Sequence, residues 1–308
     1  MHCILVRRIP AVVGFVICTL ASSAQAQELT GTLKKIGDTG SITTGVRQSL
    51  LPFSYYDNDQ KVIGYSADLC THVMDAIRTT LNISKLDVKQ MAVTSASRIP
   101  LLTNGTIDME CGATTNNAER AKQVAFSVTH FVTSNTFVSK KANNFATLDD
   151  LKGKTIASVA GTSNIKEVAE LNGERKLDMK IVPVKDHAEA FLMVETDRAV
   201  AFVMDDVILA GFVSNAKDPS AYQISKEALS VQPYAFMVRK GDTAFKKVVD
   251  DALTSVFSSD KMGPLYAKWF QQPIPPRGNN LNMPMSEATK QVLAAPTDSP
   301  DPAAYVVR

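Results

Sequence analysis

The sequence predicts an α/β fold with two domains, and three observations lead to this fold class. From Ser41 onward, strand patterns alternate with helix patterns, which is typical of βαβ units around a parallel sheet. The 308 residues exceed the roughly 100–200 residues of a usual single domain. After the N-terminus no apolar segment approaches the roughly 20 residues of a membrane-spanning helix, so we expect the mature protein to be soluble.

The N-terminal residues have the pattern of a secretory signal peptide. Arg7 and Arg8 form a positively charged start, residues 9–20 form a short apolar run, and Ala24-Gln25-Ala26 supplies the small-x-small cleavage pattern. The alternative is an N-terminal membrane anchor, which the shortness of the apolar run disfavours. We therefore expect a signal peptide at 1–26, cleavage after Ala26 and export to the periplasm.

The charge balance argues against a nucleic-acid partner. Of the 33 basic residues, Arg7 and Arg8 leave with the signal peptide, and the 31 that remain equal the 31 acidic residues. A nucleic-acid-binding domain would show a clustered basic excess. We therefore expect no nucleic-acid binding.

Two cysteines, Cys70 and Cys111, remain after cleavage. An oxidising compartment permits a disulfide between them. However, Cys70 lies in a helix pattern and Cys111 in an apolar strand, and unpaired cysteines are often buried, so we favour two buried thiols. The sequence has no CxxC, no HExxH and no cluster of His and Cys. We expect no metal and no cofactor.

The first half of the mature chain alternates strands and helices. A helix at 65–81 is predicted by Leu69, Val73 and Ile77, which lie four residues apart on one helical face. A short helix at 98–103 ends at Asn104-Gly105, where glycine permits a left-handed cap. Apolar or alternating patterns predict strands at 42–47, 86–92 and 107–111.

The second half continues the same alternation. An uninterrupted apolar run at 199–204 predicts a strand that ends at Asp205. Further strands are expected at 155–159, 180–184 and 234–238, and helices at 164–171, 187–194, 244–257, 262–270 and from residue 286. Three prolines lie within the eight residues that start at Ala295, so we expect a disordered tail at 294–308.

The residues that follow the predicted strands include an unusual number of cations. In open α/β sheets, ligands bind beyond the carboxyl ends of the strands. Arginine pairs with carboxylates through two parallel hydrogen bonds, and one acid would suit an ammonium group. This set predicts a site for a small zwitterion with an additional carboxylate. Its members are the cations Arg47, Arg98, Arg120 and His187, the hydroxyls Ser95, Thr114, Thr115, Thr162 and Ser163, and the acid Asp205.

Each of these residues also has a plainer explanation. An arginine in a helix is most often a solvated surface charge. Ser97 and Asp186 are equally well explained as helix caps, and Phe53 as part of the core. The periodicity alone therefore indicates only a secreted α/β protein that contains an anion site.

Five runs of the sequence allow comparison with a known family. They are GVRQSLLPFSYYDNDQKVIGYSADLC (45–70), TSASRIPLLTNGTIDMECGATTNNAERAKQVAFS (94–127), VKDHAEAF (184–191), RAVAFVMDDVILAG (198–211) and KWFQQPIPP (268–276). In these runs the sequence resembles the periplasmic glutamate/aspartate-binding proteins of ABC transporters, a branch of the family 3 solute-binding proteins. The similarity extends from about residue 32 to residue 293, which is nearly the whole mature chain.

The resemblance implies a bilobed periplasmic-binding-protein fold, in which two α/β lobes are joined by two hinge strands around a ligand cleft. Residues 28–133 with 235–293 would form one lobe, and 134–234 the other. In this family pattern Arg120 binds the α-carboxylate of L-glutamate or L-aspartate, with Thr115, Thr162 and Ser163, and Asp205 binds the ammonium group. The side-chain carboxylate would be held by Arg47, Ser95, Arg98 and His187.

The resemblance also implies a function, and at one position the sequence departs from the family pattern. It implies a monomer that delivers its ligand to a membrane permease and catalyses no reaction. A dehydratase for cyclohexadienyl acids and a ligand sensor are the alternatives on the same fold. Ala113 stands where the family has a serine that helps to hold the main-chain groups of the amino acid. The backbone carbonyl of Ala113 remains for the ammonium group, but one hydrogen bond is lost. Phe53 is a further candidate for packing against the ligand.

Overall fold

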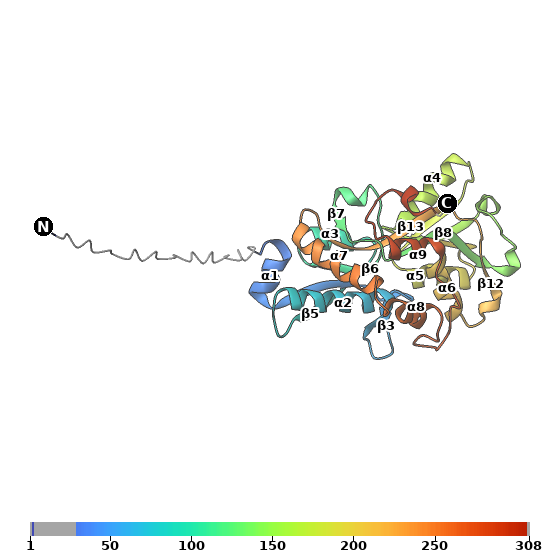
Figure 1. Cartoon of the computed structure of the whole chain (residues 1–308). Coiled ribbons are helices and arrows are strands. Elements are labelled where there is room, and N and C mark those ends of the chain that lie inside the picture. Colours follow the sequence, from blue (N-terminus) through green and yellow to red (C-terminus); the bar gives the residue numbers. More distant parts are fainter. Residues whose placement is uncertain (1, 3–28, 307–308) are drawn as a thin grey trace.

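A computed structural model describes His2 and residues 29–306. The expected cleavage site after Ala26 lies outside these residues. Within them, one large sheet has the strand order β10-β9-β11-β8-β13-β6-β1-β5, with β7 and β12 at its side (Figure 1). The strands are β1 (Ser41–Val46), β5 (Asp87–Ala92), β6 (Met109–Thr115), β7 (Val124–Phe126), β8 (Phe131–Lys140), β9 (Thr155–Val159), β10 (Lys180–Val184), β11 (Ala201–Asp205), β12 (Tyr222–Ile224) and β13 (Ser230–Arg239).

The helices cover both faces of this sheet (Figure 1). None of those in the described part of the chain is long and apolar enough to cross a membrane. The α-helices are α1 (Gly31–Thr39), α2 (Tyr65–Thr80), α3 (Arg98–Thr103), α4 (Ser163–Glu174), α5 (His187–Glu195), α6 (Asp206–Asn215), α7 (Thr243–Phe257), α8 (Met262–Phe270) and α9 (Glu287–Ala294).

Most of these elements agree with the sequence analysis. The predicted strands at 155–159 and 180–184 and the predicted helices at 98–103 and 262–270 have the predicted bounds, and the remaining predicted elements lie within a few residues of their positions. The local patterns did not predict α1, α6, β7, β8, β12 or the small sheet of β2 (Ser49–Leu50), β3 (Ser54–Tyr56) and β4 (Val62–Ile63). Apart from β8, the missed strands are only two or three residues long, too short for a periodic pattern to be recognised.

Two long strands join the halves of the sheet. β8 and β13 pair with each other in antiparallel register, with Phe131 opposite Tyr234 and Asn135 opposite Ser230. The expected parallel sheet is therefore mixed: β1, β5 and β6 are parallel on one side, and β9, β10 and β11 are parallel on the other. Both connections between the two halves run through this central pair.

The helix α2 shows how apolar spacing produces the packing. Leu69, Val73 and Ile77 are fully buried on the predicted face, and α2 packs against α7 and β6. The helix begins after Gly64, whose φ is 134°. A Cβ at Gly64 would lie 2.2 Å from the carbonyl oxygen of Phe53. Only glycine therefore permits the close approach that seats the start of α2.

The C-terminal segment differs from the disordered tail that the sequence predicts. The short helix η5 (Pro302–Tyr305) lies against β13, and Tyr305 is 1 % exposed. Its hydroxyl forms hydrogen bonds with Thr129 Oγ1 (3.0 Å) and with the Ser299 carbonyl (2.6 Å). Tyr305 packs with Val132 and Val292. Composition did not reveal this anchor because the apolar surface that receives the ring is formed only when distant segments come together.

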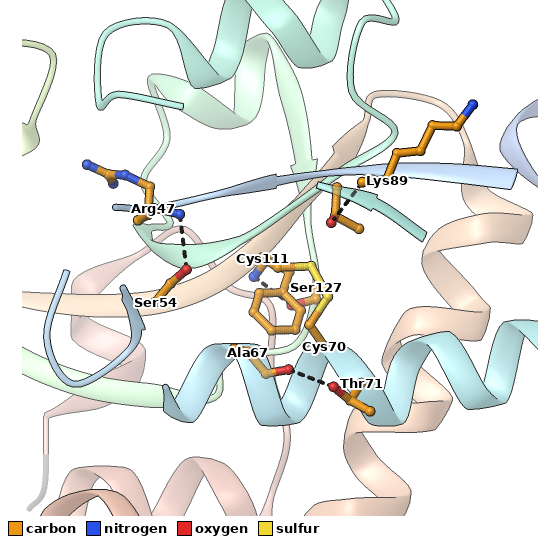
Figure 2. The surroundings of a disulfide bond; sticks show 10 residues. Arg47, Ser54, Ala67, Cys70, Thr71, Lys89, Cys111 and Ser127 are labelled. Atoms are coloured by element: carbon orange, nitrogen blue, oxygen red, sulfur yellow. Dashed lines mark hydrogen bonds between the residues drawn. A yellow bond between two sulfur atoms is a disulfide. The ribbon is translucent and has the colours of Figure 1, made fainter. Parts of the chain in front are cut away.

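The prediction of two buried thiols is wrong. Cys70 on α2 and Cys111 on β6 form a disulfide, with their Cα atoms 5.9 Å apart (Figure 2). Both cysteines are buried, as expected. Their pairing depends on the packing of α2 against β6, which the two separate sequence patterns do not show.

The disulfide is expected to stabilise the fold substantially. Cys70 and Cys111 are 41 residues apart. Closing a loop of that length lowers the conformational entropy of the unfolded chain, which raises the free energy of unfolding by up to about 4 kcal/mol. We expect the double variant Cys70→Ser/Cys111→Ser to lose about 2–4 kcal/mol of unfolding free energy in urea denaturation. A loss below about 1 kcal/mol would contradict a stabilising role of the bond.

Candidate functional site

The ten ligand-binding residues that the family resemblance implies all line one small cavity between the two halves of the sheet. Thr114, which the strand-end pattern also named, is buried beside the cavity and does not line it. The cavity therefore collects residues that are up to 158 positions apart in the chain. Among the described residues, Leu50, Asn164 and Met204 complete the lining. The ten are Arg47, Ser95, Arg98, Ala113, Thr115 and Arg120 from the half that holds β1 and β6, and Thr162, Ser163, His187 and Asp205 from the half that holds β9 and β11.

The cavity is almost closed. Its volume, measured for the centre of a water molecule, is about 10 Å³. This is about the space that a single water molecule needs. An amino acid is several times larger than a water molecule. In this conformation the cavity has no room for such a ligand.

Arg47 and Arg98 form a buried pair of cations at one end of the cavity; they are 4 % and 3 % exposed. Arg47 Nη2 donates to Ser95 Oγ (3.1 Å), and Arg98 Nη1 donates to Thr114 Oγ1 (2.5 Å). Burial, followed by repulsion from Arg98, lowers the pKa of Arg47 to about 10. Two cations that are held side by side away from water favour the binding of an anion.

The third arginine, Arg120, connects the two walls of the cavity. It begins the short helix η1 (Arg120–Lys122). Nη1 donates to the carbonyl of Thr115 on β6 (2.9 Å), and Nη2 donates to the carbonyl of Gly161, which precedes α4 (3.2 Å). Burial is the main cause that lowers the pKa of Arg120 to about 9. Its guanidinium thus lies where an anion would contact both halves of the protein.

Asp205 is the one carboxyl among the described lining residues. It is 1 % exposed, accepts a hydrogen bond from Asn164 Nδ2 (2.7 Å) and accepts another from the Tyr234 hydroxyl. Burial raises the pKa of Asp205 to about 7, although both hydrogen bonds oppose the shift. A cationic group beside Asp205 would stabilise the ionised form.

The sequence analysis missed Asn164 and Tyr234. Asn164 directly follows Ser163, which the prediction included. It was not chosen because an asparagine in a first helical turn is usually exposed. Tyr234 lies in the apolar strand β13 and gave no signal of its own. Its contact with Asp205 exists because β13 crosses the sheet between the two halves.

His187 is neutral in the structure. Burial and the neighbouring Arg47 and Arg98 lower its pKa well below the usual value of 6.5. Neither ring nitrogen has a hydrogen-bond partner among the described residues. The sequence pattern had suggested a cation, because it did not show that two arginines face the imidazole. A neutral ring still offers one N–H donor to an anion.

Phe53 does not line the cavity, although it was a candidate for packing against the ligand, and the backbone N–H of Thr162 is already used within the protein. Phe53 is fully buried and does not line the cavity. Its ring packs edge-on against Tyr234 and Phe131 at 5.2 and 5.1 Å, so it belongs to the core beside the site. At α4, the Thr162 side chain accepts from the Ile165 N–H (3.2 Å), and the Thr162 N–H donates to the Val159 carbonyl (3.3 Å).

No cluster of three or more His, Cys, Asp or Glu suited to a metal occurs in the described part of the chain.

This arrangement is a small pocket between two α/β units, in which three buried arginines and one buried carboxyl line the cavity. A family model for "Bacterial extracellular solute-binding proteins, family 3" matches residues 42–272. The chain belongs to this family. As a family 3 solute-binding protein it has the α/β periplasmic-binding-protein fold. Its structure superposes with a TM-score of 0.70 on a mutant of the arginine-binding protein from Thermotoga maritima. That protein is 28 % identical, and the match covers 78 % of this chain and 100 % of the other.

Curated members of the family are more similar in sequence. The L-glutamate/L-aspartate-binding protein of Pseudomonas aeruginosa is 49 % identical over 286 residues, which cover 92 % of this chain and 95 % of the relative. The glutamate/aspartate import solute-binding protein of Escherichia coli is 42 % identical over 295 residues, which cover 94 % and 98 %. Both matches extend over almost the full length of both proteins.

Proposed function

We propose that this solute-binding protein captures L-glutamate or L-aspartate and delivers it to the membrane permease of an ABC importer. The observation that carries this function is the pocket itself, in which three buried arginines and one buried carboxyl line the same small cavity. A dicarboxylic amino acid supplies two anions and one cation that match this set. Relatives that share 42–49 % of its residues are named for the same ligands.

The positions of the side chains suggest how the ligand is held. Arg120 would bind the α-carboxylate, because its guanidinium lies between the two walls. Asp205 and the carbonyl of Ala113 would bind the ammonium group. The side-chain carboxylate would contact the residues at the other end. These are Arg47, Ser95, Arg98 and the N–H of a neutral His187, while Thr115, Thr162 and Ser163 would complete the α-carboxylate site.

The pairing of β8 with β13 supports the proposed division into lobes. Residues 28–133 with 235–293 would form the first lobe and 134–234 the second, so that both boundaries fall inside the two crossing strands. Rotation about these strands would open the cavity for the ligand. Arg120, which contacts both walls, would favour closure when an anion neutralises its charge.

The binding role excludes catalysis as the function. The curated relatives are named as binding proteins, and this chain is a solute-binding protein and not an enzyme. A dehydratase would need a general acid placed against a leaving group. Asp205 is already engaged by Tyr234 and Asn164, and in the proposed complex it contacts the ammonium group.

The family description places the protein outside the cytoplasm, and we propose that the location is the periplasm. The support is the signal pattern at 1–26 in the sequence. Mass spectrometry of the exported protein is expected to find Gln27 at the mature N-terminus. Recovery of a chain that still begins at Met1 from the membrane fraction would contradict this proposal.

Calorimetric titration of the ligand-stripped mature protein tests the proposed function. L-glutamate and L-aspartate are expected to bind, whereas L-glutamine and citrate are expected to bind much more weakly. An amide leaves the buried Arg47 and Arg98 without an anion, and loss of a hydrogen bond to a charged group costs roughly 1.5–3 kcal/mol. Tighter binding of L-glutamine or citrate than of both acidic amino acids would overturn the assignment.

Asp205 is expected to make glutamate binding depend on pH. In the closed structure its pKa is raised to about 7, so below this pH the carboxyl holds a proton. The ammonium group of a bound ligand lowers that pKa, and binding then releases one proton. Affinity should therefore fall by up to about tenfold for each pH unit below 7 and level off above it. Titrations in buffers of different ionisation enthalpy measure the released proton; affinity that rises as the pH falls would contradict the prediction.

A further inference from the structure

Glu110 is a fully buried carboxylate that lies behind the cavity and does not line it. It sits on β6. Its Oε2 accepts from Thr114 Oγ1 (2.7 Å), and its Oε1 lies 3.9 Å from Arg98 Nη1 and has no hydrogen-bond partner among the described residues. A buried carboxylate without full hydrogen bonding is costly. Its position beside the cations of the site calls for an explanation.

The contacts of Thr114 show how Glu110 acts on Arg98. A hydroxyl has one proton to donate, and an ionised carboxylate can only accept, so Thr114 donates to Glu110. The oxygen of Thr114 therefore accepts from Arg98 Nη1 (2.5 Å). Glu110 in this way orients the hydroxyl that positions Arg98.

Gly112 provides the space for this arrangement. A Cβ at Gly112 would lie 2.2 Å from Glu110 Oε1 and 3.3 Å from Arg47 Cγ. The carboxylate of Glu110 thus folds over the backbone of Gly112, next to the side chain of Arg47. Among the acids that act on Arg47 and Arg98, Glu110 has the largest effect on each of them.

The charges of the buried groups set a definite balance. Among the described residues in or directly behind the cavity, Arg47, Arg98 and Arg120 carry three positive charges. Glu110 and ionised Asp205 carry two negative charges, and His187 is neutral. These six groups together have a net charge of +1. A buried net charge is unfavourable, so a ligand of charge −1 gives the most favourable total.

We propose that Glu110 is a positioning residue that restricts the ligand to a net charge of −1. This inference rests on the proposed function and explains why a dicarboxylic amino acid is preferred to a ligand with one charge more. Without Glu110 the site would have a charge of +2. Its preference would then move toward ligands with more negative charge.

Two ligands of the same length and shape test this proposal. At pH 8, O-phospho-L-serine has a net charge of about −2, because the second pKa of its phosphate is about 6. L-homocysteate has a similar tetrahedral anion and a net charge of −1. Glu110→Gln keeps an oxygen that can accept from Thr114 and removes only the charge. We expect the affinity ratio of phosphoserine to homocysteate to rise at least about tenfold, since one charge at this range has such an effect.

Matched variants separate charge from structure. Glu110→Asp keeps the charge and should retain the wild-type ratio. Thr114→Val also keeps the charge; it should weaken both ligands because Arg98 loses its acceptor, and it should leave the ratio unchanged. Melting curves followed by circular dichroism show whether each variant is folded. A purely structural role of Glu110 would weaken both ligands in Glu110→Gln and would not raise the ratio.

A second pair of variants covers the case in which Glu110→Gln does not fold. Arg98→Gln and Arg98→Gln/Glu110→Gln differ by the same single charge, and the double variant has the net charge of the wild type. The ratio should rise at least about tenfold from the first to the second. An unchanged ratio in both comparisons would overturn the inference. Failure of the wild type to bind glutamate and aspartate would instead contradict the proposed function.

Discussion

Replacing Arg120 with alanine is expected to weaken the binding of every amino-acid ligand by about 2–5 kcal/mol, the usual cost of removing one partner of a desolvated charge pair. The loss should be similar for glutamate, aspartate and glutamine, since all three present the same α-carboxylate. Arg120 also contacts the Thr115 and Gly161 carbonyls on opposite walls. The variant therefore loses both a ligand contact and a contact that holds the cavity closed. Calorimetric titration with the three ligands measures the effect.

The stability of the ligand-free variant provides the control. Burial is the main cause that lowers the pKa of Arg120 to about 9, which shows that the cation is held at a cost before any ligand binds. Arg120→Ala should therefore not lower the thermal stability of the ligand-free protein by more than a few degrees. Added glutamate should no longer raise the melting temperature. Loss of glutamate binding with glutamine binding intact would assign Arg120 to the side-chain carboxylate instead.

Replacing Arg98 with alanine is expected to separate acidic from neutral ligands. Arg98 lies with Arg47 at the other end of the cavity, 3 % exposed and bound to Thr114. Without Arg98, the side-chain carboxylate of glutamate loses a buried partner, which costs about 2–5 kcal/mol. Glutamine has no charge at this position. Its amide oxygen can lose at most one hydrogen bond from the guanidinium, worth roughly 1.5–3 kcal/mol, so its residual binding should fall less than that of glutamate.

An exposed arginine offers a matched control for the change in total charge. Arg175, at the end of α4, pairs with Asp149 and Glu227 on the surface. Arg175→Ala removes the same charge from the protein far from the cavity lining, so its affinities should match the wild type. Equal losses of glutamate and glutamine in Arg98→Ala would refute the assignment of Arg98 to the side-chain carboxylate.

The positions of the site residues could be predicted because they follow directly from strand ends. Arg47 comes after β1, Thr162 and Ser163 come just after β9, and Asp205 ends β11. Local patterns identify such strands, and the geometry of α/β sheets then brings their carboxyl ends together. The chemistry of the ligand could be predicted for the same reason, from the excess of arginines at these positions.

The ionisation of the site could not be predicted in this way. His187 is neutral because Arg47 and Arg98 face it, and the pKa of Asp205 is raised to about 7 because the carboxyl is buried. Both effects depend on which groups are close together and how far water is excluded. Neither quantity is contained in the spacing of residues along the chain.

The sequence by itself determined the fold class, the order of most strands and helices, and ten of the residues that line the cavity. These features depend on apolar periodicity and on short local signals, which act between residues that are near one another in the chain. Only the tertiary structure decided the Cys70–Cys111 disulfide, the anchoring of Tyr305 and the place of Glu110 behind the arginines. Each of these depends on contacts across the packed core. Such contacts are formed by the whole fold, and a local pattern does not specify its distant partner.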